Sequence, residues 1–152
     1  MVEIKRIRPE QTYELRHRIL RPHQEIKDCQ YPGDLDSTTS HFGAICSEQI
    51  VGILSVYKIN HNDIDLPNSW QLRAMATAES VRGKGYGAML IERVESTIAD
   101  QNGQCIWANA RIHAVGFYQN LDYAVIGYEF DIPNVGPHQL VYKQLSTVSA
   151  TN

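Results

Sequence analysis

The stretch Arg82-Gly83-Lys84-Gly85-Tyr86-Gly87 decides how the rest of the chain is interpreted. It stands directly before the clearest helical pattern of the sequence, which ends at Asn102-Gly103. The first N–H groups of a helix have no partner within it, and the helix dipole places partial positive charge there. Glycines let the backbone approach a phosphate closely, and Arg82 and Lys84 add full charges. The stretch therefore predicts a binding site for an anion.

Two familiar phosphate-binding motifs fit this stretch poorly. Gly83, Gly85 and Ala88 satisfy the loose G-x-G-x-x-G/A form of a dinucleotide fingerprint, but the flanking strands follow hairpin-like connections and not a parallel βαβ unit. A P-loop is excluded because Lys84 is followed by Gly85 and not by Ser or Thr. The remaining alternative is a glycine-softened connector without a ligand, although three alternate glycines and two cations exceed what a connector needs.

The composition indicates one globular domain and argues against two classes of partner. The chain has 152 residues, of which 43% are hydrophobic and 20% charged. It carries 14 basic and 17 acidic side chains, a net charge of −3. A general nucleic-acid or anionic-membrane binder would have a basic balance, so we expect neither partner.

The cysteines and the first residues indicate a cytoplasmic protein. Cys29, Cys46 and Cys105 are odd in number and lack the spacing of a zinc site, so we expect no disulfide framework and no metal. No signal-like apolar run follows Met1, and the longest apolar stretch, residues 50–57, is too short to cross a bilayer.

Hydrophobic periodicity predicts an α+β fold with a mixed, mostly antiparallel central sheet flanked by helices. The expected strands are residues 2–7, 42–46, 50–57, 70–77, 105–108, 123–130 and 138–145. Glu48-Gln49 are expected to turn the chain between the second and third strands, and residues 70–77 to alternate between two faces. Helices are expected from Pro9, after the glycine-rich stretch, and around residues 114–121, with a long irregular connection at residues 21–40. We expect one domain at residues 1–145 and a polar tail at residues 146–152.

Two segments, which follow one another in the chain as they do in the family, resemble motifs of the GCN5-related N-acetyltransferases, the GNAT family. Residues 82–87 resemble the family's Q/R-x-x-G-x-G/A segment, and residues 75–77 resemble the strand end before it. Residues 109–123 resemble its second cofactor-binding stretch, N-A-R-x-x-A-x-x-F-Y-x-x-L-G-F, with Asp122 in place of the usual Gly. Residues 13–22, residues 31–34 and Gly136-Pro137-His138 resemble a bacterial branch of this family that includes ElaA-like proteins.

The resemblance implies that acetyl-CoA is the acetyl donor. The implied cofactor-binding residues are Met75, Ala76, Thr77, Arg82, Gly83, Lys84, Gly85, Tyr86, Gly87, Asn109 and Phe117. The backbone of Met75 and Thr77 would pair with the peptide-like pantetheine arm and polarise the thioester carbonyl. The implied reaction is direct attack by a primary amine of a small molecule or peptide in a ternary complex.

That reaction needs an acid for the leaving thiolate and a base for the incoming ammonium. Tyr118 is the expected acid, although Phe117 and Tyr118 could both be core residues. Asn109 is expected to bind the pantetheine arm or a bridging water, or alternatively to cap the next helix from a loop. For the base we select His138, with a water chain to solvent and three further side chains as alternatives. These side chains are His113, Glu79 and Glu129.

The acceptor and the assembly state stay open. Six basic side chains either line an acceptor site or form a solvated helix face: Arg16, His17, Arg18, Arg21, His23 and His41. A non-catalytic acyl-CoA sensor on the same fold is the alternative function, and a Rossmann-like nucleotide binder is a more distant one. We expect a monomer or a homodimer.

Overall fold

Strands and helices follow one another in the order that the sequence predicts. A computed structural model describes residues 1–145, and its first strand, β1 (Val2–Ile7), has the predicted bounds. A continuous helical run follows from Pro9 to Leu20, and Pro9 occupies the first turn, where its missing N–H is not needed. The predicted polar tail lies outside the described residues.

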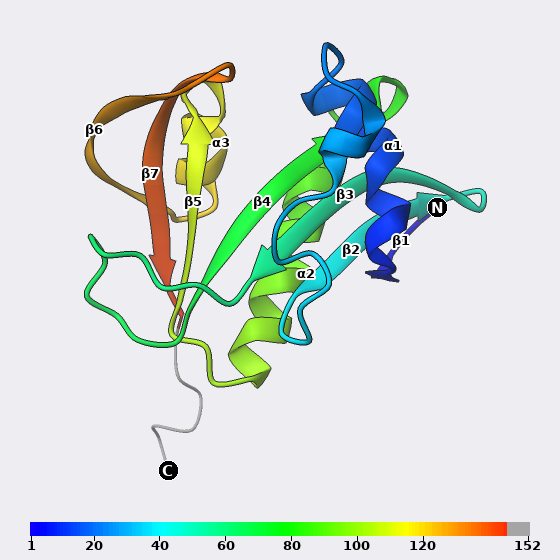
Figure 1. Cartoon of the computed structure of the whole chain (residues 1–152). Coiled ribbons are helices and arrows are strands. Elements are labelled where there is room, and N and C mark those ends of the chain that lie inside the picture. The colour runs from blue at the N-terminus through cyan, green and yellow to red at the C-terminus, as the bar shows by residue number, and fades with distance from the viewer. Residues whose placement is uncertain (146–152) are drawn as a thin grey trace. The chain divides into compact units, whose positions relative to one another are not determined.

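The remaining elements complete the pattern (Figure 1). The strands are β2 (Ser40–Cys46), β3 (Gln49–Tyr57), β4 (Ser69–Thr77), β5 (Cys105–Arg111), β6 (Ala124–Ile132) and β7 (Gly136–Gln144). The helical segments are η1 (Pro9–Thr12), α1 (Tyr13–Leu15), η2 (Arg16–Leu20), η3 (Ile26–Cys29), η4 (Glu79–Val81), α2 (Tyr86–Asp100), η5 (Ile112–Ala114) and α3 (Val115–Asn120).

Hydrogen bonding joins the strands in the order β1-β2-β3-β4-β5-β7-β6. The ladders β1–β2, β2–β3, β5–β7 and β6–β7 are antiparallel, and β4–β5 is parallel. The α+β class with a mixed, mostly antiparallel sheet is therefore confirmed. By their internal contacts the residues group into two units, Met1–Lys58 with Arg73–Thr97, and Ile59–Leu72 with Ile98–Asn152.

In the first unit, the predicted apolar stripe of helix α2 is buried, and Leu90 of this stripe approaches β3. Leu90, Ile91 and Val94 are each at most 1% exposed. Gly52 of β3 allows this approach, because a Cβ there would lie 3.3 Å from Leu90 Cδ1 and 3.3 Å from Ala44 Cβ. The apolar stripe predicted from the sequence is thus the buried face of α2. The contact of Leu90 with β3 fixes the position of the first turns of this helix.

Two local predictions for this unit are wrong. The β2–β3 turn uses Ser47 and Glu48, both with positive φ, because a two-residue hairpin turn of matching twist needs that conformation; Gln49 already pairs with Cys46. Strict alternation along β4 also fails. Ala74 adopts φ +59°, and residues 73–75 are all half-buried, because this backbone conformation breaks the two-residue period.

In the second unit, β5 is longer than predicted and its side chains build a small core. Ile64, Cys105, Trp107 and Leu140 pack together, and Trp107 Nε1 donates to the Ile59 carbonyl at 2.8 Å. Asn109 pairs with Leu140 inside the β5–β7 ladder, so the interpretation of Asn109 as a helix cap is wrong.

Asp122 follows α3 with φ +73°. That left-handed conformation explains why the family pattern has glycine there and why Asp, which tolerates it better than most residues, can substitute. No helix within residues 1–145 is long and apolar enough to span a membrane.

Candidate active site

The glycine-rich turn presents backbone N–H groups at the start of α2. Gly83 and Gly85 have φ values of +84° and +83°, and a Cβ built on either would meet no atom within 4 Å. Of the amides of residues 82–88, only that of Lys84 is paired within the described chain, with the Val81 carbonyl at 3.3 Å. The turn therefore combines unpaired donors with open space, the two requirements for holding an oxyanion on a helix N-terminus.

The side chains of the turn divide into two groups. Arg82 and Lys84 are exposed, and neither has a carboxylate within 4 Å among the described residues. Tyr86 is half-buried, and its hydroxyl lies 3.4 Å from Cys46 Sγ at the end of β2. Arg82 and Lys84 can thus supply charged side chains to a ligand, whereas Tyr86 and the three glycines can supply backbone N–H groups.

The end of β4 places Met75, Ala76 and Thr77 in the same unit as the turn. The β4–β5 ladder is three residue pairs long and ends at Gln71, so these residues lie beyond it. The Ala78 amide donates to the Val51 carbonyl at 2.7 Å and holds this end of β4 to β3. Backbone groups beyond the parallel ladder are the kind that an extended, amide-containing ligand can pair with.

In the second unit, Tyr118 has a buried ring. The ring makes edge-on contacts with Phe117 and Tyr123, each at a centroid distance of 5.4 Å. Burial raises the pKa of Tyr118 to about 12, so its hydroxyl is protonated at neutral pH. No hydrogen bond of this hydroxyl to another described residue is found. The ring of Tyr118 is thus part of the core, as the alternative to a catalytic role predicts. Its O–H has no acceptor among the described residues and can donate a hydrogen bond to a ligand.

His138 is buried at the start of β7, and one of its nitrogens has an assigned role. Nδ1 lies 2.7 Å from the Gly136 carbonyl, which can only accept, so Nδ1 carries the proton. In the neutral ring Nε2 then carries the lone pair that a base needs. The ring also lies 6.1 Å from that of Phe130.

The alternative bases differ from His138 in their surroundings. Glu79 is exposed and pairs with Arg18; hydrogen bonding to its own backbone and to Arg18 lowers the pKa of Glu79, which weakens it as a base. His113 and Glu129 are exposed, on η5 and β6. Asn109 and Phe117 are half-buried, on β5 and α3 in the unit that also holds Tyr118 and His138.

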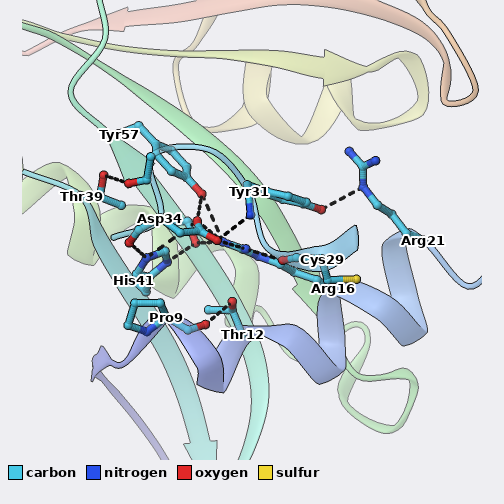
Figure 2. A network of polar contacts seen from close by, with 12 residues as sticks. Pro9, Thr12, Arg16, Arg21, Cys29, Tyr31, Asp34, Thr39, His41 and Tyr57 are labelled. Atoms are coloured by element: carbon cyan, nitrogen blue, oxygen red, sulfur yellow. Dashed lines mark hydrogen bonds and ion pairs between the residues drawn. The ribbon is translucent and has the colours of Figure 1, made fainter. Parts of the chain in front are cut away.

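Sequence reasoning missed a buried polar network in the first unit (Figure 2). Arg16 is fully buried, and its Nη1 donates to Asp34 Oδ2 at 2.7 Å and to the Cys29 carbonyl at 2.8 Å. Its Nη2 donates to Asp34 Oδ1 at 3.1 Å and to Ser55 Oγ at 2.9 Å. The prediction of a solvated helix face is therefore wrong for Arg16. A signal was present, because Arg16 stands one helical turn after the buried Thr12 and next to Leu15.

The network fixes its own protonation states. Burial raises the pKa of Asp34, but hydrogen bonds from Arg16 and Tyr57 outweigh burial and hold that pKa below its usual value. Burial lowers the pKa of His41. His41 Nε2 lies 3.0 Å from the Asp34 carbonyl and Nδ1 lies 2.7 Å from Ser55 Oγ, which suits a neutral ring protonated at Nε2. His41 is therefore part of the scaffold and not of a solvated face.

Within residues 1–145 no group of three or more His, Cys, Asp or Glu side chains is arranged to hold a metal ion.

Comparisons with known proteins show the family and the fold of the chain. The chain is 39% identical over 147 residues to an uncharacterized N-acetyltransferase, YitI, of Bacillus subtilis (strain 168), covering 97% of this chain and 99% of that protein. An aminoglycoside 6'-N-acetyltransferase solved in complex with coenzyme A superposes with a TM-score of 0.75 at 14% identity, over 93% of this chain and 96% of that one. Escherichia coli ElaA superposes with a TM-score of 0.74 at 15% identity, over 94% and 99%. The model of the acetyltransferase (GNAT) family matches residues 2–123, and the chain belongs to this family of acetyltransferases.

Proposed function

We propose that the protein transfers the acetyl group of acetyl-CoA to a primary amine by direct attack in a ternary complex. The observation that carries the proposal is the turn of Gly83 and Gly85, with positive φ values, open space around both Cα atoms and unpaired amides. These features suit the diphosphate of coenzyme A, and Arg82 and Lys84 supply matching charge. The complex of the aminoglycoside 6'-N-acetyltransferase with coenzyme A supports the same ligand class for this fold.

Acetyl-CoA supplies an activated thioester, and the residues of this chain bind it and move protons. We assign the backbone of Met75 and Thr77 to the pantetheine arm, together with Ala76, Asn109 and Phe117 along the cofactor. Tyr118 donates its phenolic proton to the departing thiolate, since its raised pKa keeps that proton in place at neutral pH. His138 Nε2 accepts a proton from the incoming ammonium, because Nδ1 is held in its protonated form. The C–N bond thus forms as the C–S bond breaks, and the attacking nitrogen gives up two protons: the first goes to His138, and the second, released as the amide forms, restores the phenol of Tyr118.

The three free cysteines fit a reducing compartment and support a cytoplasmic location. The acceptor named by a relative, an aminoglycoside, shows that this fold can take amines on a small polar molecule. For this chain we propose an amine-bearing small molecule or peptide.

Replacement of Tyr118 by Phe tests the reaction against the sensor alternative. We expect Tyr118→Phe to keep the affinity for acetyl-CoA and to lower turnover about 100-fold, the low end of general acid effects. The measurements are calorimetric titration of acetyl-CoA and thiol release with a panel of amines. Tyr128→Phe is the matched control, since it removes a hydroxyl from a side chain that is 94% exposed. Unchanged turnover in Tyr118→Phe would remove Tyr118 from the mechanism, and tight binding without turnover on any amine would favour the sensor.

A further inference from the structure

Three arginine side chains converge on the ring of Tyr31. The guanidinium carbon lies 4.2 Å from the ring centroid for Arg16, 5.0 Å for Arg21 and 4.9 Å for Arg73. Arg21 Nε also donates to the Tyr31 hydroxyl at 2.9 Å, at the outer end of the network in Figure 2. Arg73 lies 5.4 Å from the ring centroid of Tyr57 as well. The aromatic rings hold the cations in place through cation–π contacts.

The charges of this cluster do not balance. Asp34 is buried and already receives hydrogen bonds from Arg16, Tyr57 and the Tyr31 amide. Neither Arg21 nor Arg73 has a carboxylate within 4 Å in the described part of the chain, and the other side-chain acceptor of Arg21 is Gln24 Oε1, at 3.4 Å. Two guanidiniums therefore stand near one ring without a counter-charge, in a chain whose net charge is −3.

The surroundings of Arg21 and Arg73 differ from those of Arg18, which lies in the same helical run as Arg16. Arg18 is exposed and pairs with both Glu14 and Glu79. Like charges close together repel, and the repulsion grows as water is displaced. Arg21 and Arg73 are half-buried, so they retain contact with solvent and can meet a ligand. A planar guanidinium fork matches a carboxylate or a phosphate in two parallel hydrogen bonds.

The position of Arg73 relates the cluster to the reaction. Arg73 stands directly before Ala74, whose φ of +59° breaks the alternation of β4, and two residues before Met75. Residues 73–75 are consecutively half-buried, so Arg73 and Met75 are both accessible on the same stretch of strand. A group bound by Arg73 would thus lie along the strand to which we assign the pantetheine arm.

We propose that Arg21 and Arg73, held by Tyr31, bind an oxyanion of the acceptor, so that the substrate is an amine that also carries a carboxylate or a phosphate. This inference rests on the proposed acetyl transfer and names the substrate class of the same site. The acid group fixes the acceptor, and the free amine of that acceptor is the nucleophile.

Matched acceptor pairs test the proposal by activity. Each pair differs only in the acid group: amino acids against their C-terminal amides, and O-phosphoethanolamine against ethanolamine. We expect wild type to prefer the acidic member of at least one pair at least 10-fold in kcat/KM. Arg73→Gln should remove that preference, and Arg73→Lys should restore part of it. The acceptor pair that shows the preference identifies the bound acid group as a carboxylate or a phosphate. Arg8→Gln is the control, because Arg8 is exposed and paired with Glu10 at 2.8 Å.

Calorimetry tests the same inference without turnover. N-acetylated amino acids and N-acetyl-O-phosphoethanolamine are titrated into the full chain with coenzyme A present and absent, each beside its neutral analogue. We expect an acidic ligand to bind at least about 10-fold more tightly than its neutral analogue in wild type and Arg8→Gln, and equally in Arg73→Gln. Failure of all acetyl transfer would contradict the proposed function alone, and this titration would still decide the anion site. Equal binding of acidic and neutral ligands to wild type, or equal losses in Arg73→Gln and Arg8→Gln, would overturn the inference.

Discussion

The buried network around Asp34 and the glycine-rich turn at residues 82–87 both gather donors suited to an oxyanion, but they differ in where the anion comes from. In the network the anion is a side chain of the protein, because Asp34 accepts from Arg16, Tyr57 and the Tyr31 amide. In the turn, no carboxylate of the described residues lies within 4 Å of Arg82 or Lys84. Donors that are matched internally stabilise a fold, whereas donors left unmatched at open backbone indicate a ligand.

The largest expected effect comes from breaking the matched region. Asp34→Ala leaves Arg16 as an uncompensated buried charge, and we expect a loss of about 3–5 kcal/mol in the free energy of unfolding. Gly85→Glu forces a side chain into a left-handed conformation without a steric contact, and we expect a loss of about 1–2 kcal/mol. Urea denaturation measures both variants.

The double variant Arg16→Met with Asp34→Leu provides the control, since it removes both charges together. We expect it to recover most of the stability lost in Asp34→Ala. If Asp34→Ala loses less than Gly85→Glu, the assignment of the network to the scaffold is wrong.

The pH dependence of stability is a smaller effect that separates the network's two acid-sensitive groups. The pKa of His41 is lowered by burial, so the unfolded chain binds this proton first as the pH falls below about 6.5. The pKa of Asp34 is also lowered, so its contribution is present above about pH 4 and is lost below it. We expect stability to fall between pH 6.5 and 5 by at most about 1.4 kcal/mol per pH unit from His41.

The variant His41→Gln isolates that contribution. Its stability should be flatter than that of wild type between pH 6.5 and 5, and its loss below pH 4 should persist. Parallel curves for the two proteins across the upper range would show that His41 does not titrate on unfolding.

The difference between the two regions also explains what the sequence could predict. The turn is encoded by consecutive residues, so its glycines, its cations and the stripe of α2 could be identified together. The network joins residues far apart in the chain, such as Arg16 and Tyr57, and only the register of β2 and β3 brings His41 opposite Ser55. Local periodicity carries no information on that pairing.

A similar limit applies within single elements. The left-handed backbone at Ala74 cannot be predicted from the sequence, because alanine rarely adopts a positive φ and no glycine marks the position. The helix-cap alternative for Asn109 fails because β5 continues three residues beyond the apolar run that indicates the strand. The assignment of Tyr118 to catalysis depends on the family resemblance, and that of His138 depends on its place after Gly136-Pro137 at the start of the last strand. Both stay predictions.

The most direct test of the account compares coenzyme A with pantetheine, which lacks the diphosphate and the adenosine 3'-phosphate attached to it, by calorimetric titration. We predict that wild type binds coenzyme A at least about 100-fold more tightly, because several charge-assisted hydrogen bonds depend on the diphosphate. Gly85→Glu should abolish this difference. Gly127→Glu, which places the same side chain at an equally open glycine with φ +74° on β6, should preserve it. Equal affinity of wild type for the two ligands, or an unchanged preference in Gly85→Glu, would contradict the assignment of the diphosphate to this turn.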